Sequence, residues 1–137
     1  MIRAVATLAL LSLAAAPAAA QDWDCSKADE LPQQGMNWCA GVEYQQADKA
    51  LNDLWPKVRA AVKKDDAELK RIDPSLVGAD AALIKAQRGW IDYRDGQCEG
   101  EGFYARGGSL EPLLVTTCKT RMTRRRTDEL HKLIEAD

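Results

Sequence analysis

Apolar residues recur at steps of three and four through three long stretches of the chain, which is the spacing of one helix face. The first stretch begins at Cys39, and its apolar positions are Ala40, Tyr44, Ala47, Leu51, Leu54/Trp55, Val58 and Val62. The second begins near Leu76 and fades near Cys98, with Leu76, Leu83, Ala86/Gln87, Trp90 and Tyr93/Arg94 on one face. The third follows Ser109, with Leu110, Leu113/Leu114, Cys118, Met122, Leu130 and Leu133/Ile134. No alternating strand pattern is present, so the sequence predicts an all-α fold.

Breaks in the pattern predict where these helices end. Pro56 lacks an amide donor, so we expect it to kink the first helix or mark its restart. Residues 65–75 are expected to form a charged connector, alone or with one extra turn of helix. Ser75 and Ser109 are expected to be the N-caps of the second and third helices, and the glycines of residues 99–108 separate those two helices.

Three helices of about 23–26 residues with short connections pack most simply as an antiparallel bundle. In an up-down-up arrangement, the start of the first helix, the end of the second and the start of the third meet at one pole. Cys39, Cys98 and Cys118 lie near those three termini, and Cys25 is close enough in sequence to Cys39 to reach the same pole. We therefore expect all four cysteines to cluster at one end of the bundle.

Four cysteines in a small exported domain favour two disulfides. A zinc site is disfavoured because the gaps of 13, 58 and 19 intervening residues lack the two tight pairs that such sites show. Geometry alone leaves three pairings open. We favour Cys25–Cys39 and Cys98–Cys118, each closing a short loop, while a crossed pairing such as Cys25–Cys118 remains an alternative.

The first 20 residues have the pattern of a secretory signal peptide: Arg3, an apolar run, and small residues ending at Ala20. The run is too short for a membrane span, although a retained anchor helix is an alternative. No cysteine directly follows Ala20, which argues against a lipoprotein. We expect one domain over residues 21–137, located in the periplasm or secreted.

The charge of the exported chain disfavours one class of partner. Removal of residues 1–20 takes away Arg3, one of 19 basic residues, and leaves all 21 acidic ones, so the net charge falls from −2 to near −3. Nucleic-acid binding favours a strong positive excess, so we expect no nucleic-acid partner.

An enzymatic site is disfavoured. Cys98 with His131 as its base would form a nucleophilic pair, but the single histidine lies about 20 Å along the third helix from Cys118. Asp92 and Asp95 could form a carboxylate pair, but Arg88 and Asp92 fit an i,i+4 salt bridge better. We therefore predict no catalytic residue, no metal and no cofactor.

A structural polar cluster is the preferred interpretation of the second helix. Gln87, Trp90 and Arg94 would point into the bundle and meet acidic or amide side chains of the first helix and an arginine of the third. The predicted members are Asp48, Asn52, Gln87, Trp90, Arg94 and Arg126. The basic residues of positions 119–126 either form a patch for an anionic surface or pair with neighbouring acids, and we favour pairing.

The loop of residues 99–111 is the candidate contact surface. Phe103 and Tyr104 either cap the bundle end or form an exposed contact, because aromatic residues are enriched at interface cores. Residues 22–30 add four acids against Lys27 at the same pole, which would suit a cationic partner. The predicted contact residues are Glu99, Glu101, Phe103, Tyr104, Arg106 and Ser109.

Three motifs in this order resemble the LprI-like lysozyme-inhibitor family. They are Tyr44-x-x-Ala47-Asp48-x-x-Leu51-Asn52-x-x-Trp55, Ala86-Gln87-Arg88-x-Trp90-Ile91-x-Tyr93-Arg94-Asp95-x-x-Cys98, and Gly107-Gly108-Ser109 with Cys118 and Thr123-x-x-Arg126-x-x-x-Leu130. The resemblance covers nearly all of residues 21–137, and the second motif is the most specific. It implies a small exported helical domain with disulfides that binds and inhibits lysozyme. Our leading hypothesis is that the protein partner is a cationic lysozyme and that inhibition occurs by occlusion of its cleft. The alternative is an envelope scaffold or adaptor with another protein partner.

Overall fold

The computed structural model describes residues 22–135, and its secondary structure is helical with no strand in that range. The all-α helical prediction is therefore confirmed. The long helices are α1 (Gln33–Ile72), α2 (Ala79–Gly102) and α3 (Glu111–Glu135), and the short 3-10 turns are η1 (Cys25–Glu30), η2 (Pro74–Leu76) and η3 (Phe103–Ala105). The predicted signal peptide, residues 1–20, lies outside the described residues. Among the helices of residues 22–135, none is both long and apolar enough to span a bilayer.

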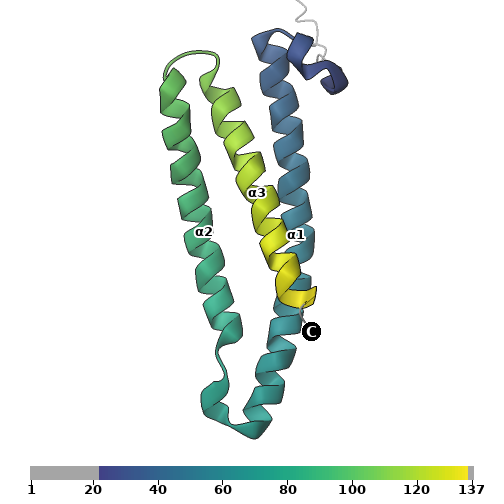
Figure 1. Cartoon of the computed structure of the whole chain (residues 1–137), viewed down its shortest axis with the longest axis vertical. Coiled ribbons are helices and arrows are strands. Elements are labelled where there is room, and N and C mark those ends of the chain that lie inside the picture. The colour runs from purple at the N-terminus through teal and green to yellow at the C-terminus, as the bar shows by residue number, and fades with distance from the viewer. Residues whose placement is uncertain (1–21, 136–137) are drawn as a thin grey trace, which may run out of the picture.

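The three long helices run alternately down, up and down along the long axis of the molecule (Figure 1). α1 packs more extensively against α3 than against α2. Both α1 and α2 extend beyond the C-terminal end of α3, and η2 connects them at that far tip (Figure 1). The connection between α2 and α3 lies at the opposite end, beside the start of α1. We call this end, which includes η1, the disulfide pole.

α1 is longer than the sequence predicted, because it continues without interruption through Pro56 to Ile72. The missing amide of Pro56 deprives the Asn52 carbonyl of its helical partner, but Asn52 is exposed, so water can serve instead. Leu54 and Val58, on either side of the proline, are buried and hold the helix in place. The expected connector over residues 65–75 is therefore wrong for residues 65–72.

The end of α1 is tied to the start of α2 by the carboxylate of Asp66. Its oxygens accept hydrogen bonds of 3.0–3.1 Å from the backbone N–H groups of Gly78, Ala79 and Asp80. These donors have no partner within α2, because the first amides of a helix point away from its own carbonyls. Asp66 thus supplies the capping that the sequence analysis assigned to Ser75.

Both predicted serine caps are wrong. Ser75 lies within η2, where its backbone N–H donates to the side chain of Asp73 at 2.8 Å. Ser109 lies in a turn before Glu111, where α3 begins. Its backbone carbonyl instead accepts a 3.0 Å hydrogen bond from the side chain of Asn37 on α1.

The hydrophobic core lies between the middle of α1, the first half of α2 and the end of α3. Its buried members are Leu51, Leu54, Val58, Leu83 and Leu130, with Trp55, Val62, Trp90 and Ile134 packed against them. Each such side chain contributes about 1.5–3 kcal/mol on removal from water. α3 also buries Thr120 and Thr123, which a search for apolar spacing overlooks.

Two disulfides join Cys25 to Cys39 and Cys98 to Cys118, each with a Cα–Cα distance of 5.4 Å. The pairing is the sequence-adjacent one that the sequence analysis favoured. The first bond fixes η1 against the second turn of α1. The second bond joins the last turns of α2 to the first turns of α3, so it spans the connection that contains η3.

Candidate functional site

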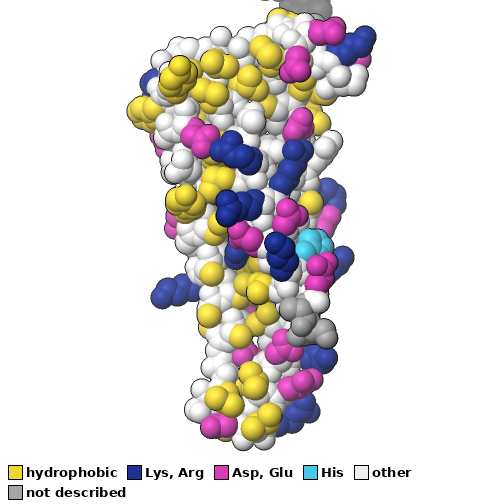
Figure 2. Space-filling model, viewed as in Figure 1, with side chains coloured by type: hydrophobic (Ala, Val, Ile, Leu, Met, Phe, Trp, Pro, Cys, Tyr) yellow, Lys and Arg dark blue, Asp and Glu magenta, His cyan; other side chains and the backbone are white. Residues whose placement is uncertain are grey.

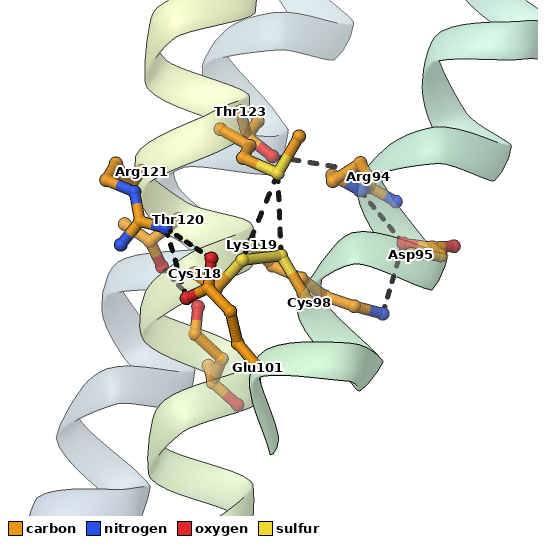
Figure 3. The surroundings of a disulfide bond; sticks show 11 residues. Arg94, Asp95, Cys98, Glu101, Cys118, Lys119, Thr120, Arg121 and Thr123 are labelled. Carbon is orange, nitrogen blue, oxygen red and sulfur yellow. Dashed lines mark hydrogen bonds and ion pairs between the residues drawn. A yellow bond between two sulfur atoms is a disulfide. The ribbon is translucent and has the colours of Figure 1, made fainter. Parts of the chain in front are cut away.

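The Arg94 side chain is the centre of a polar cluster inside the bundle, and its residue is only 7% exposed. Its Nε donates to Asp95 at 2.9 Å, and its Nη1 lies 3.5 Å from the Thr123 hydroxyl of α3 (Figure 3). On α1, the Asp48 carboxylate lies 3.8 Å from the same Nη1. One guanidinium therefore contacts all three long helices.

Aromatic rings enclose this guanidinium. Its central carbon lies 5.0 Å from the centroid of the Trp90 ring and 5.7 Å from that of Tyr44. Arg126 of α3 lies 6.0 Å from the Trp90 ring, and its Nε donates to the Gln87 amide oxygen at 3.0 Å. A cation over an aromatic face is stabilised by the ring quadrupole, most strongly where water is excluded.

Acidic side chains complete the cluster. Lys119 of α3 and Arg94 both contact Asp95, Lys119 at 3.2 Å. Partial burial raises the pKa of Asp95, but the hydrogen bonds and charges of Arg94 and Lys119 outweigh burial and leave that pKa below its ordinary value. Asn52 donates to Asp48 at 2.9 Å. The structure thus brings Asp48, Asn52, Gln87, Trp90, Arg94 and Arg126 into one network.

The buried polar atoms around this network are satisfied by protein groups. Every buried side-chain nitrogen or oxygen in residues 22–135 has a hydrogen-bond partner. Cys98 is bonded to Cys118, with Met122 Sδ 3.6 Å from its sulfur, so no thiolate is available there. His131 is exposed on α3. Within the described residues, no ion pair joins Arg88 to Asp92, so the expected salt bridge is wrong.

The disulfide pole carries exposed aromatic side chains. Phe103 is 55% exposed and Tyr104 is 90% exposed, both within η3. Trp38 on α1 and Leu110 before α3 are also exposed, at 39% and 38%. Figure 2 shows hydrophobic side chains gathered at this end of the molecule, over the connection between α2 and α3. Phe103 and Tyr104 therefore do not cap the bundle core but face solvent.

Side chains outside η3 hold the loop that follows it. The Glu111 carboxylate accepts hydrogen bonds of 2.7 Å from the backbone N–H of Gly107 and from Arg106 Nη1. The Arg106 guanidinium also lies 4.3 Å from the centroid of the Phe103 ring. The Gly107 hydrogen bond is the main cause of a lowered pKa at Glu111; burial opposes it, and the hydrogen bond and charge of Arg106 add to the lowering. This latch was not predicted from the sequence, although Gly107 and Glu111 are only four positions apart.

The two predicted acidic contact residues differ in how available they are to a partner protein. Glu99 is exposed, whereas Glu101 accepts two hydrogen bonds from Arg121, at 2.8 and 3.1 Å (Figure 3). The basic residues of positions 119–126 are likewise paired. The ion pairs are Lys119–Asp95, Arg121–Glu101, Arg124–Glu43, Arg125–Glu129 and Arg126–Glu129. This face of α3 therefore matches the favoured interpretation of paired charges.

Comparison with known proteins places the chain in one family. The family model "Lysozyme inhibitor LprI" matches residues 25–130. A protein of Rhizobium meliloti (strain 1021) named "Uncharacterized protein R02472" is 49% identical over 138 residues, covering 99% of this chain and 98% of that protein. No solved structure matches the chain. Because the family model spans most of the chain, including both disulfides and the Arg94 cluster, the protein belongs to the LprI lysozyme-inhibitor family.

Proposed function

We propose that this protein is exported, binds a cationic lysozyme-type peptidoglycan hydrolase and inhibits it by occluding the active-site cleft. The contact surface is the disulfide pole, with the loop of residues 99–111 at its centre. The observation that carries this proposal is the 90% exposure of Tyr104 on a loop whose backbone is held by Glu111, in a chain of the LprI family.

A held aromatic side chain suits insertion into a cleft. Binding is weakened by the entropy of ordering mobile groups, so a loop that is ordered before contact loses less on association. Tyrosine adds a large contact area with only two side-chain torsions to fix. Phe103 and Tyr104 are adjacent and exposed, and they are the only aromatic residues of the loop of residues 99–111.

Charge at the pole supports a cationic partner. Residues 22–30 carry four acidic side chains and one lysine, and Glu99 is exposed at the end of α2. Opposite charges on two surfaces increase the rate of productive encounter and disfavour like-charged competitors. Two disulfides fit an oxidising compartment such as the periplasm or the exterior, which is where such a hydrolase acts.

A cell-wall clearing assay tests the proposal. Purified residues 21–137 are titrated against several lysozymes, and complexes are sought by gel filtration. The double variant Phe103→Ala/Tyr104→Ala should weaken inhibition at least about tenfold, because buried aromatic contacts at an interface each contribute more than about 1 kcal/mol. Tyr93→Ala is the matched control, since Tyr93 is 61% exposed but lies on α2, two turns of helix before that loop.

The outcomes separate the candidate functions. Absence of both inhibition and complex formation at micromolar concentration would remove the proposal. A complex without inhibition would favour the envelope adaptor. Inhibition that is unchanged in the Phe103/Tyr104 variant would exclude the loop as the contact surface, even if the chain proves to be an inhibitor.

A further inference from the structure

A second feature of the disulfide pole is a pocket of about 270 Å³ between η1, α1 and α3. Its apolar lining comes from Met36, Cys39, Ala40 and Leu113, and two carboxylates, Asp29 and Glu43, also line it. The apolar atoms and the two acids come from three different elements. The Cys25–Cys39 disulfide holds η1 in place beside α1, so this bond gives the pocket one of its walls.

An apolar pocket with two carboxylates matches the side chains of lysine and arginine. These side chains bury their methylene stems along apolar surface while keeping the charged head near water or an acid. A neutral apolar side chain would leave the Asp29 carboxylate without a charged partner. An anionic group would be repelled, because two acids would face it.

One of the two pocket carboxylates already pairs with a guanidinium of this chain. Arg124 Nη2 lies 3.2 Å from Glu43 Oε2, and both side chains are 57% exposed. An ion pair so exposed contributes little stability, so an incoming cation can replace or join Arg124 at small cost. Asp29 is exposed, and among residues 22–135 it has no ion-pair partner.

We propose that this pocket, named here the basic-side-chain pocket, receives one arginine or lysine side chain of the cationic partner. The inference rests on the proposed function for the identity of the protein that carries that side chain. The pocket lies near the loop of residues 99–111, because Asn37, next to Met36 in α1, donates a side-chain hydrogen bond to the Ser109 carbonyl, and Leu113, which lines the pocket, follows that loop by two positions. One partner surface can therefore contact Tyr104 and fill the pocket together.

A small-molecule titration tests the pocket without any lysozyme. Nα-acetyl-arginine methylamide and Nα-acetyl-lysine methylamide are added to the wild-type protein, and NMR follows the methyl groups of Ala40, Thr117 and Thr120, which line the pocket. We expect saturable shifts with a dissociation constant of about 1–10 mM for at least one of the two probes. The neutral analogue Nα-acetyl-citrulline methylamide should produce none.

Two charge-matched variants decide the assignment. Asp29→Asn/Glu43→Gln should abolish the shifts, whereas Asp53→Asn/Glu68→Gln, which removes one aspartate and one glutamate farther along α1, should retain them. The absence of saturable shifts with both cations, or equal shifts in the two variants, would overturn the pocket assignment.

The same variants in the clearing assay connect the pocket to inhibition. We expect Asp29→Asn/Glu43→Gln to weaken inhibition about five- to tenfold relative to the control variant, with a smaller salt dependence. Equal inhibition by both variants would overturn the role of the pocket in partner binding. If wild-type protein binds the arginine or lysine probe but inhibits no lysozyme, the proposed function fails while the pocket itself stands.

Discussion

The backbone N–H of Gly107 donates a 2.7 Å hydrogen bond to the Glu111 carboxylate, in the first turn of α3. Gly107 has a φ of +78°, a conformation that side chains disfavour and glycine adopts readily. The other carboxylate oxygen binds Arg106, whose guanidinium lies over Phe103. The loop that presents Tyr104 is therefore held by the contacts of Glu111 with Gly107 and Arg106. Its conformation does not require its aromatic side chains to be buried.

Acidification should release this loop. The pKa of Glu111 in the folded protein lies below its ordinary value of 4.5, chiefly because Gly107 donates to the carboxylate. The stabilisation is therefore fully present above about pH 4.5 and is lost as the pH falls through the lower, folded-state pKa. The Gly107 amide resonance, followed by NMR from pH 7 downward, should shift with a midpoint below 4.5. In Glu111→Gln this titration should be absent; a midpoint at or above 4.5 in the wild type would contradict the latch.

Gly102 of α2 packs tightly against α3 at the disulfide pole. A Cβ atom added there would lie 2.5 Å from Val115 Cγ2, well inside van der Waals contact. We expect Gly102→Ala to lower the free energy of unfolding by about 1–3 kcal/mol, the usual range for overpacking. Urea denaturation provides the measurement.

Gly96 on the same helix provides the matched control for that substitution. A Cβ there meets nothing within 4 Å, so Gly96→Ala should stabilise the protein by about 0.5–1 kcal/mol through its better helix propensity. The two alanine variants should therefore shift in opposite directions. Similar shifts would show that the helices do not approach closely at Gly102.

Arg94 should be the most sensitive polar position of the bundle. Arg94→Met keeps most of the side-chain volume but removes the donor to Thr123 and one of the two cationic partners of Asp95, so we expect a loss of about 2–3 kcal/mol in the free energy of unfolding. Arg88→Met, on the exposed face of α2, should change it by no more than about 0.5 kcal/mol. Thermal unfolding of both variants checks this, and equal losses would show that the Arg94 cluster contributes little.

Sequence periodicity located this cluster because the relevant side chains repeat at helical intervals. Gln87, Trp90 and Arg94 share one face of α2 by spacing alone. The same reasoning missed Thr123, because threonine does not register as apolar even where it is fully buried. Periodicity detects which face of a helix points inward, but it does not identify which polar partners meet there.

Helix ends were predicted less well, since distant contacts decide them. Pro56 and the charges of residues 65–72 suggested that the first helix is interrupted. α1 nevertheless continues through Pro56 and through residues 65–72, because side chains beside the proline are packed in the core and Asp66 caps the start of α2. The basic-side-chain pocket was not predicted from the sequence either. Its two acids lie on η1 and α1, and its apolar wall includes Leu113 of α3, so no single stretch of sequence contains it.

The two disulfides should contribute similarly to stability but differently to inhibition. Cys25–Cys39 and Cys98–Cys118 span 14 and 20 residues, so the loss of either should lower the free energy of unfolding by about 3 kcal/mol. The Cys98–Cys118 bond, however, joins the two helices that flank η3, and its loss frees the loop that presents Tyr104. We therefore expect Cys98→Ser/Cys118→Ser to weaken inhibition more than Cys25→Ser/Cys39→Ser, measured where circular dichroism shows both to be folded. The Cys25–Cys39 variant should instead lose binding of the arginine probe, because that bond fixes η1 beside the pocket. Equal effects of the two variants on inhibition and on probe binding would show that the disulfides stabilise the pole only as a whole.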